Sequence, residues 1–265
     1  MATELQTRRQ PVPPSRGGGG ISIEGVSHAY GAPRGARLPV LREISLRAHR
    51  DEVLGVVGPS GCGKTTLLEL ICGLQRPDAG AIRCPPAALM PQQDLLLPWF
   101  SALDNAGLAL RLAGASRAQA RRGAAEAFAQ LGLAGFEGAR PQELSGGMRQ
   151  RVAFLRTLLS GKPLLCLDEP FGALDAITRS EMQDWLAHAL LRRPHTVVLV
   201  THDVEEAVLL ADRIAVLSPR PGNVVEQLDV QIPRPRRRTD PQVVALRERA
   251  LAALHIAARE RRERM

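Results

Sequence analysis

The stretch that decides the fold is GPSGCGKTT, Gly58 to Thr66. It satisfies the pattern G-x-x-x-x-G-K-[ST] and follows the apolar, β-branched run VLGVVG of residues 53–58, which is typical of a buried central strand. Apolar residues at helical spacing come directly afterwards, namely Leu67, Leu68, Ile71 and Leu74. A strand, a glycine loop and a helix in this order are the context in which this pattern binds phosphate groups.

The glycine loop predicts a site for the phosphates of a nucleotide. Its backbone N–H groups can turn inward on the phosphates, and the N-terminus of the following helix adds about half a positive charge. Lys64 is expected to reach the terminal phosphates as a compact cation, and Thr65 to offer its hydroxyl to Mg²⁺. We therefore predict nucleotide contacts along the whole loop, from Gly58, Pro59, Ser60, Gly61, Cys62, Gly63, Lys64, Thr65 and Thr66.

A magnesium nucleotide also needs a carboxylate, and the run LLCLDEP of residues 164–170 supplies two. Asp168 is predicted to hold Mg²⁺ directly or through water, and Glu169 to orient and deprotonate an attacking water. A pair of acids at a strand end also suits a simple cap, but the glycine loop upstream favours the catalytic interpretation. His202 ends another apolar run, so it is expected at the same carboxyl edge of the sheet, where it can bond the γ-phosphate.

The rest of the chain alternates strand and helix patterns, which predicts a mostly parallel sheet covered by helices. Further strands are expected at residues 21–30, 163–169, 196–203 and 213–218, with the turn-rich loop GAPRGARLP at residues 31–39. Residues 101–160 contain helical stretches and no convincing strand. One amphipathic helix should bury Met182, Trp185, Leu186 and Ala189.

The composition argues against a membrane-spanning chain, a cysteine metal site and a nucleic-acid-binding protein. Residues 1–20 are rich in Pro, Gly and Arg, which predicts a disordered tail. No run approaches the roughly 18 apolar residues that a membrane span needs, and the four cysteines lack metal-ligand spacing, so free thiols are expected. The net charge of +8 comes almost wholly from Arg, and aromatic residues make up 3% of the chain. Since that is too few for a base-stacking platform, no nucleic-acid partner is expected.

These motifs, together with the signature LSGGMRQR of Leu144 to Arg151, resemble the ATP-binding subunit of an ABC transporter over about residues 21–232. The resemblance includes Gln92 in MPQQDLLLPW, Asp175 in FGALDAITR and His202 in VTHDVEEAVLLADRI. It implies an α/β fold, the P-loop NTPase ABC ATP-binding cassette. This fold has a mostly parallel core sheet, an N-terminal antiparallel β part and an inserted helical subdomain, here at about residues 93–160. Residues 233–265 form a basic extension that we predict to be helical.

The resemblance also implies how the site is completed. Two subunits pair head to tail, so that Ser145, Gly146 and Gly147 hold the γ-phosphate of the ATP on the partner's glycine loop. One loop and one signature per chain imply a homodimer or half of a close heterodimer. Gln92 is implied to contact Mg²⁺ and the attacking water, and Asp175 to lie at the dimer seam. Tyr30 stands where the family stacks an aromatic ring on adenine, with a plain core tyrosine as the alternative.

As a family member the chain is expected to hydrolyse ATP with Mg²⁺ at the cytoplasmic face of the cell membrane. Its expected partners are integral membrane permease subunits and, indirectly, an extracytoplasmic solute-binding protein. Met148, FGALDAITR and LSPRPG look most like the nitrate, sulfonate and taurine importers, whose relatives also carry pyrimidine precursors. The apolar run LLLPWF is predicted to receive the permease, with packing inside the helical subdomain as the alternative.

A soluble ABC-type ATPase acting on DNA or ribosomes is the second hypothesis. Such proteins typically carry two cassettes or long coiled-coil insertions, and this sequence has neither. The arginine runs RPRRR and RERR near the end of the chain either bind an anionic surface or form a solvated charge run.

Overall fold

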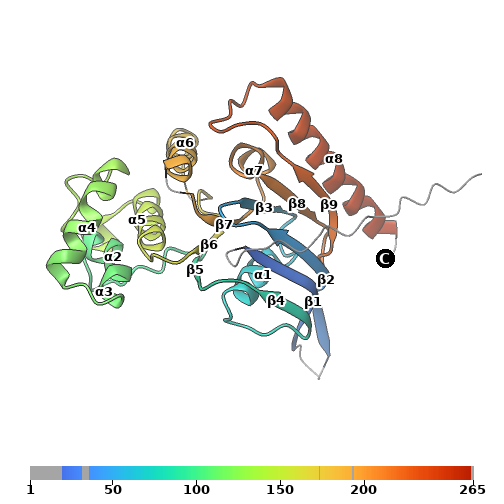
Figure 1. Ribbon diagram of the computed structural model, residues 1–265, viewed down its shortest axis with the longest axis horizontal. Coiled ribbons are helices and arrows are strands. Elements are labelled where there is room, and N and C mark those ends of the chain that lie inside the picture. The colour runs from blue at the N-terminus through green and yellow to red at the C-terminus, as the bar shows by residue number, and fades with distance from the viewer. Residues whose placement is uncertain (1–19, 32–35, 173, 193, 264–265) are drawn as a thin grey trace, which may run out of the picture.

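The computed structural model describes residues 20–31, 36–172, 174–192 and 194–263. The disordered tail predicted for residues 1–20 therefore lies outside the described residues, apart from Gly20. Two sheets and their covering helices form one part of the molecule, and a group of helices projects to one side of them (Figure 1).

The larger sheet has six strands in the order β5-β6-β7-β3-β8-β9. All neighbouring pairs are parallel except β8 and β9, which are antiparallel. This confirms the prediction of a mostly parallel sheet. The strands are β3 (Val53–Val57), β5 (Ala87–Met90), β6 (Leu164–Asp168), β7 (Thr196–Thr201), β8 (Arg213–Leu217) and β9 (Val224–Asp229).

Strand β3 explains why its sequence is apolar at every position. Leu54 and Val56 belong to the apolar cluster shared with helix α1, whereas Val53 and Val57 belong to the cluster on the opposite face. Because alternate side chains of a strand point to opposite faces, both sets are buried. Both faces of the sheet are therefore covered at β3.

The smaller sheet is antiparallel, in the order β2-β1-β4, and is formed by β1 (Ile21–Gly31), β2 (Arg37–Ala48) and β4 (Ala79–Arg83). The loop predicted over residues 31–39 is wrong at both ends, since Gly31 is the last residue of β1. Arg37, Leu38 and Pro39 belong to β2, where they pair with the end of β1. Proline is tolerated there because β2 is an edge strand.

The helices packed around the sheets are α1 (Lys64–Ile71), α6 (Ala176–Arg192), α7 (Val204–Leu210) and α8 (Pro241–Glu263). The expected continuation of α1 to Leu74 is wrong, since that side chain is 65% exposed. Gly73, with φ +70°, ends the helix in the left-handed conformation, and Leu74 N–H bonds the Glu69 carbonyl at 2.9 Å. In α6, Met182 and Leu186 are buried as predicted. Trp185 and Ala189 are only partly buried.

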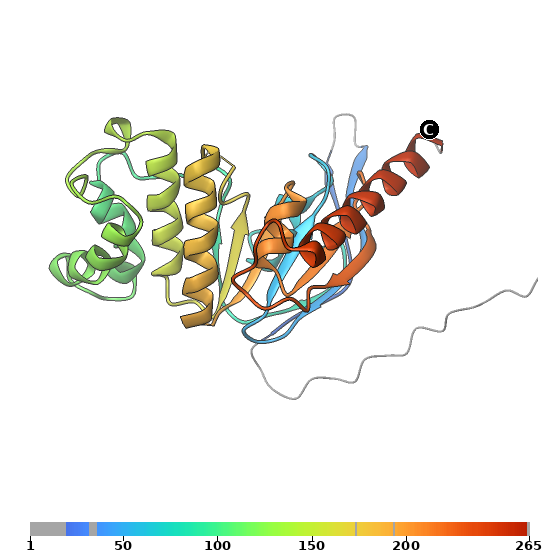
Figure 2. The same cartoon turned by 90° about the horizontal axis from the view of Figure 1, so that it is seen from above.

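The inserted helical group follows β5 and comprises α2 (Ala102–Ala106), α3 (Leu108–Leu112), α4 (Arg117–Gln130), the short 3₁₀ helix η2 (Pro141–Glu143) and α5 (Gly146–Leu158). Phe128 and Phe154 are fully buried in its core. Helix α5 runs beside α6 (Figure 2), where the rings of Phe154 and Trp185 meet edge to face at 5.8 Å. Among the described helices, none is long and apolar enough to cross a bilayer.

The arginine run RPRRR at residues 234–238 corrects both interpretations made from the sequence. Arg234, Arg236 and Arg238 turn inward and bond groups of the protein itself, so these three form neither a solvated face nor a free anionic-surface site, whereas Arg237 is exposed. Arg236 is only 8% exposed. For the run RERR at residues 259–262, the structure describes the side chain of Arg259, which is exposed.

Candidate active site

The glycine loop joins β3 to α1 in a conformation that requires glycine. Gly63 has φ +107°, and a Cβ there would lie 2.6 Å from Leu41 Cδ2. Gly61 is also left-handed, with φ +74°. Within the described residues no side chain caps the N-terminus of α1, so its first-turn N–H groups are available to an anion.

The side chains of the loop divide into exposed and buried sets. Lys64 is 6% exposed, and its ammonium donates to the carbonyls of Gly58 at 2.9 Å and Pro59 at 3.2 Å. Cys62 is buried and burial raises the pKa of its thiol, so only its backbone can reach a ligand. Ser60, Gly61 and Thr65 are exposed, Pro59 is half-buried, and Gly58, Gly63 and Thr66 are buried.

Asp168, the last residue of β6, is 2% exposed. Its Oδ2 atom has no hydrogen-bond partner among the described residues. Burial raises the pKa of the carboxyl, as does the charge of Glu169, whereas a hydrogen bond from the Thr65 side chain lowers it. Since buried carboxylate oxygens are normally satisfied, this free oxygen beside the Thr65 hydroxyl suits a bound cation.

Three polar residues meet at the carboxyl edge of the sheet because they follow three neighbouring strands. Gln92 follows β5, Glu169 follows β6 and His202 follows β7. The Nε2 atom of Gln92 donates to Glu169 Oε2 at 3.1 Å, and Nδ1 of His202 lies 3.1 Å from Glu169 Oε1. Glu169 is therefore the residue that the other two contact.

Glu169 has an unusual backbone. Its φ of +47° lies in the left-handed region, which is uncommon outside glycine and clusters at functional sites. Two hydrogen bonds hold it there, from its own N–H to the Val200 carbonyl at 2.8 Å and from Gly172 N–H to its carbonyl at 3.1 Å. This conformation turns the chain sharply after Asp168, and the two adjacent acids face different surroundings.

The signature forms the start of α5. Ser145 caps this helix, its Oγ accepting from Met148 N–H at 3.2 Å. Ser145 and Gly146 are exposed, and Gly147 is half-buried. Figure 1 shows α5 within the projecting helices, away from α1. One chain therefore presents its glycine loop and its signature at separate places.

Two arginines of α5 fix the segment after Gln92 to this helix, a role that the sequence did not indicate. Arg149 donates to the Asp94 carboxylate at 2.9 Å, and Arg156 donates to the carbonyls of Asp94 and Leu95 at 2.8 and 2.9 Å. The helical spacing of Arg149 and Arg156 was the available signal, but their partners lie far away in the sequence. These bonds link the Gln92 segment to the signature helix.

The two remaining predicted residues lie on the surface. Asp175 is exposed and accepts hydrogen bonds from the N–H groups of Ile177 and Thr178, both at 3.1 Å. The Thr178 side chain is the main cause of a lowered pKa at this carboxyl. Tyr30 is 36% exposed, so it is not a core residue, and its hydroxyl lies 3.2 Å from Thr66 Oγ1. Its stacking on adenine stays a prediction.

A glycine loop at the head of a parallel sheet, with an acidic pair and a histidine at the carboxyl ends of the adjoining strands, defines a nucleotide phosphate site of the P-loop class. The ABC transporter family model matches residues 41–172. The taurine import ATP-binding protein TauB of Chromobacterium violaceum is 43% identical over 235 residues, which cover 82% of this chain and 90% of that protein. The chain belongs to the ABC transporter family.

A second relative and a solved structure support this family assignment. The formylaminopyrimidine import ATP-binding protein ThiZ of Halalkalibacterium halodurans is 42% identical over 221 residues, covering 82% of this chain and 86% of that protein. A solved dimeric ATP-binding cassette, in a post-hydrolysis state bound to ADP and Pi, matches with a TM-score of 0.73 and 27% identity. That match covers 80% of this chain and 99% of the other. The fold predicted from the sequence, an ABC ATP-binding cassette, is confirmed.

Proposed function

We propose that this chain is the ATP-hydrolysing subunit of an ABC importer, which dimerises on ATP and drives solute uptake through separate membrane subunits. The observation that carries the ATPase assignment is the meeting of Gln92 and His202 at Glu169, at the sheet edge that also bears Asp168. Relatives over 40% identical whose names describe import support the direction of transport.

The nucleotide phosphates bind to the N–H groups of the glycine loop and to Lys64. In this structure the ammonium bonds the Gly58 and Pro59 carbonyls, so a phosphate would compete for bonds that are already formed. Thr65 and Asp168 hold Mg²⁺, and the orphaned Oδ2 of Asp168 supports this assignment. Bound there, Mg²⁺ neutralises charge on the phosphates.

Glu169 is the general base for the attacking water. It takes the water's proton after one of its oxygens is released from Gln92 or His202, since both oxygens are engaged in this structure. Gln92 orients the water and approaches the Mg²⁺ site, and His202, whose side chain is 59% exposed, donates to the γ-phosphate. Gln92 and His202 thus position the reacting groups, and Glu169 accepts the proton; all three residues follow neighbouring strands.

Two copies of the chain form each complete site. Ser145, Gly146 and Gly147 of one copy bind the γ-phosphate held by the other copy's glycine loop. The exposed, capped start of α5 supports this arrangement, since helix N-termini favour anions. Asp175 lies at the seam of the dimer, and Tyr30 stacks on adenine beside Thr66.

The permease binds the surface formed by Leu95 and Trp99, which are 58% and 64% exposed. The packing alternative accounts for Leu96, which is 9% exposed, and in part for the half-buried Leu97 and Phe100. The transported solute belongs to the nitrate, sulfonate and taurine group or to the pyrimidine precursors, in line with the names of the relatives. The chain acts at the cytoplasmic face of the membrane, with a solute-binding protein on the far side.

Purification of the tagged chain in mild detergent, followed by mass spectrometry of the copurified proteins, tests this proposal. A polytopic membrane protein together with an extracytoplasmic solute-binding protein supports the importer, and the ligand of the latter identifies the solute. Ribosomal proteins or nucleic acid without a membrane partner would instead support a soluble ABC-type ATPase. Magnesium-dependent hydrolysis of ATP by the purified chain is measured in parallel.

A further inference from the structure

The segment after β9 contacts both ends of helix α7. Arg236 donates to the carbonyls of Val208 at 2.8 Å and Ala211 at 2.6 Å, at the C-terminal end of that helix. Arg234 donates to both carboxylate oxygens of Asp212 at 2.8 and 2.9 Å. Cationic donors at these last carbonyls are favourable because the helix leaves them unpaired. One end of α7 is thereby fixed.

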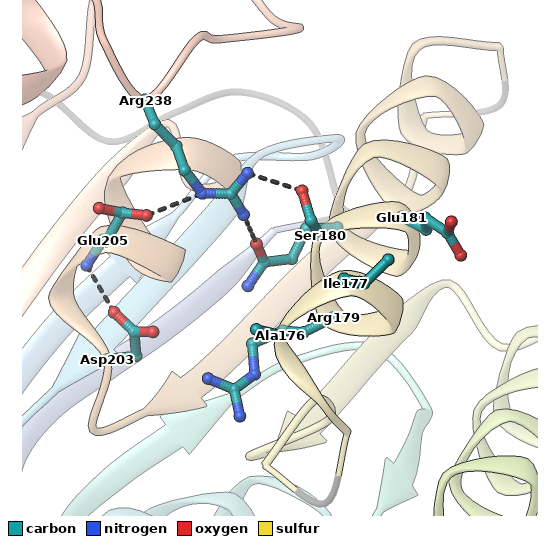
Figure 3. Close-up of a pocket in the computed structure, with 9 residues that line it drawn as sticks. Ala176, Ile177, Arg179, Ser180, Glu181, Asp203, Glu205 and Arg238 are labelled. Carbon is teal, nitrogen blue, oxygen red and sulfur yellow. Dashed lines mark hydrogen bonds and ion pairs between the residues drawn. The ribbon is translucent and has the colours of Figure 1, made fainter.

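Arg238 reaches the other end of α7 and also contacts α6 (Figure 3). Its Nε donates to Glu205 in the first turn of α7 at 2.8 Å. Its two terminal nitrogens donate to Ser180 Oγ at 2.7 Å and Gln183 Oε1 at 2.5 Å, both on α6. A single guanidinium therefore bridges the two helices, using the planar set of donors that lysine lacks.

The bridge spans an opening. A groove of about 560 Å³ lies between the starts of the two helices, from Ala176 and Ile177 on one side to Asp203 on the other. Apolar packing does not fill this groove, and the contacts of Arg238 with Glu205 and Ser180 connect the two helices beside it. Figure 3 shows the Arg238 side chain between Glu205 of α7 and Ser180 of α6.

The starts of both helices carry predicted site residues. Asp175 bonds the first turn of α6. Asp203 caps α7 through the N–H groups of Glu205 and Glu206, and it directly follows His202, which contacts Glu169. A change in the separation of α6 and α7 would therefore move His202 and Asp175 relative to each other.

We infer that Arg238 is a positioning residue for ATP hydrolysis, which holds the helix after His202 at a fixed distance from the helix after Asp175. This inference rests on the proposed function, because it assumes that His202 acts at the γ-phosphate. Arg238 itself touches no phosphate-binding group, so its loss should affect the chemical step more than nucleotide binding.

The test compares Arg238→Ala and Arg238→Gln with the unaltered chain in steady-state ATP hydrolysis. We expect kcat to fall about tenfold, as misplacement of a site group predicts, while KM and the dissociation constant for ATP change less than twofold. Arg238→Lys, with one compact donor group, should recover part of kcat. Arg249→Ala is the matched control, since Arg249 lies in the same C-terminal segment, is 63% exposed and pairs with Glu226 at 2.7 Å.

The bridge is also broken from its α6 side by Ser180→Ala and Gln183→Leu, which remove two of the three partners of Arg238. Each should lower kcat in the same direction, and combining either with Arg238→Ala should lower it no further, since the bridge is already lost. Variants that lose thermal stability but keep the kcat of the unaltered chain would overturn the positioning role. If the unaltered chain itself does not hydrolyse ATP, the proposed function fails instead.

Discussion

His202 Nδ1 lies 3.1 Å from Glu169 Oε1, between the ends of two adjacent strands of one sheet. The strands β6 and β7 are in parallel register, with Asp168 opposite Val200, so the residues that follow them emerge at the same edge. The proximity of the histidine and the acid is thus a consequence of strand order. Both residues should be required for hydrolysis.

Replacing Glu169 with Gln should slow ATP hydrolysis by at least roughly 10²- to 10⁴-fold, the range typical of losing a general base. ATP binding should persist, because the glycine loop and Lys64 are unchanged. Phosphate release and equilibrium binding of a fluorescent ATP analogue measure the two properties. Glu126→Gln, at an exposed site on α4, is the control. Full turnover in the Glu169 variant would show that another group is the base.

Replacing Lys64 with Ala should weaken ATP binding itself by roughly 10- to 100-fold, since charge-assisted hydrogen bonds contribute about 1.5–3 kcal/mol. The matched control is Lys162→Ala, because Lys162 is the other lysine of the sequence and is exposed. Isothermal titration calorimetry gives both dissociation constants. Equal affinities for the two variants would exclude contact between Lys64 and the phosphates.

The glycine loop was predictable because its chemistry is local. Gly63 must be glycine for reasons of backbone conformation and the nearby Leu41 side chain, and the flanking strand and helix carry their own patterns. The acidic pair was predictable for the same reason, as it ends an apolar run. Predicting which residues meet at Glu169 also required the order of the strands in the sheet, which the family resemblance supplied.

The parts that the sequence did not reveal depend on distant partners. Arg236 is buried because its acceptors are carbonyls at the end of α7, and nothing in RPRRR indicates these acceptors. The extent of β2 depends on its pairing with β1, which overrides the turn signals of Gly and Pro. The Cys62 side chain is buried, so the nucleotide contact predicted for this residue is possible only through its backbone, and the motif alone does not reveal this.

Glu206 should make stability depend on pH. It is 4% exposed, and burial, with a smaller contribution from Asp203, raises its pKa from 4.5 to about 8, while Arg179 and Thr201 oppose this and Glu169 adds to it. Because the folded chain keeps a proton that the unfolded chain releases, the free energy of unfolding falls as pH rises from about 4.5 to about 8, by a few kcal/mol.

Glu206→Gln tests this dependence, since the amide has no proton to lose. Relative to the unaltered chain, the variant should become progressively more stable between pH 5 and pH 8.5, as measured by urea unfolding at each pH. Glu126→Gln, at an exposed position, should leave the profile unchanged. A constant difference between Glu206→Gln and the unaltered chain at all pH values would contradict the raised pKa.

Replacing Trp99 with Ala should uncouple transport from hydrolysis. The side chain is 64% exposed, so folding and the ATPase activity of the isolated chain should not change. Association with the permease should weaken by about 2 kcal/mol or more, as is typical of a central tryptophan at an interface. Solute uptake by reconstituted vesicles measures the effect, and Leu112→Ala, at 82% exposure in the same helical group, is the control. Unchanged uptake would rule out this surface as the permease contact.

Two copies of the chain should share each ATP. Light scattering after size-exclusion chromatography tests it most directly with Glu169→Gln, which should bind ATP without releasing it. With Mg²⁺ and ATP the measured mass should double from 28.7 kDa, and a second change, Ser145→Arg, should abolish the doubling because it fills the signature. A monomer in saturating ATP, or a dimer that persists with Ser145→Arg, would show that the signature of one copy does not bind the ATP of the other.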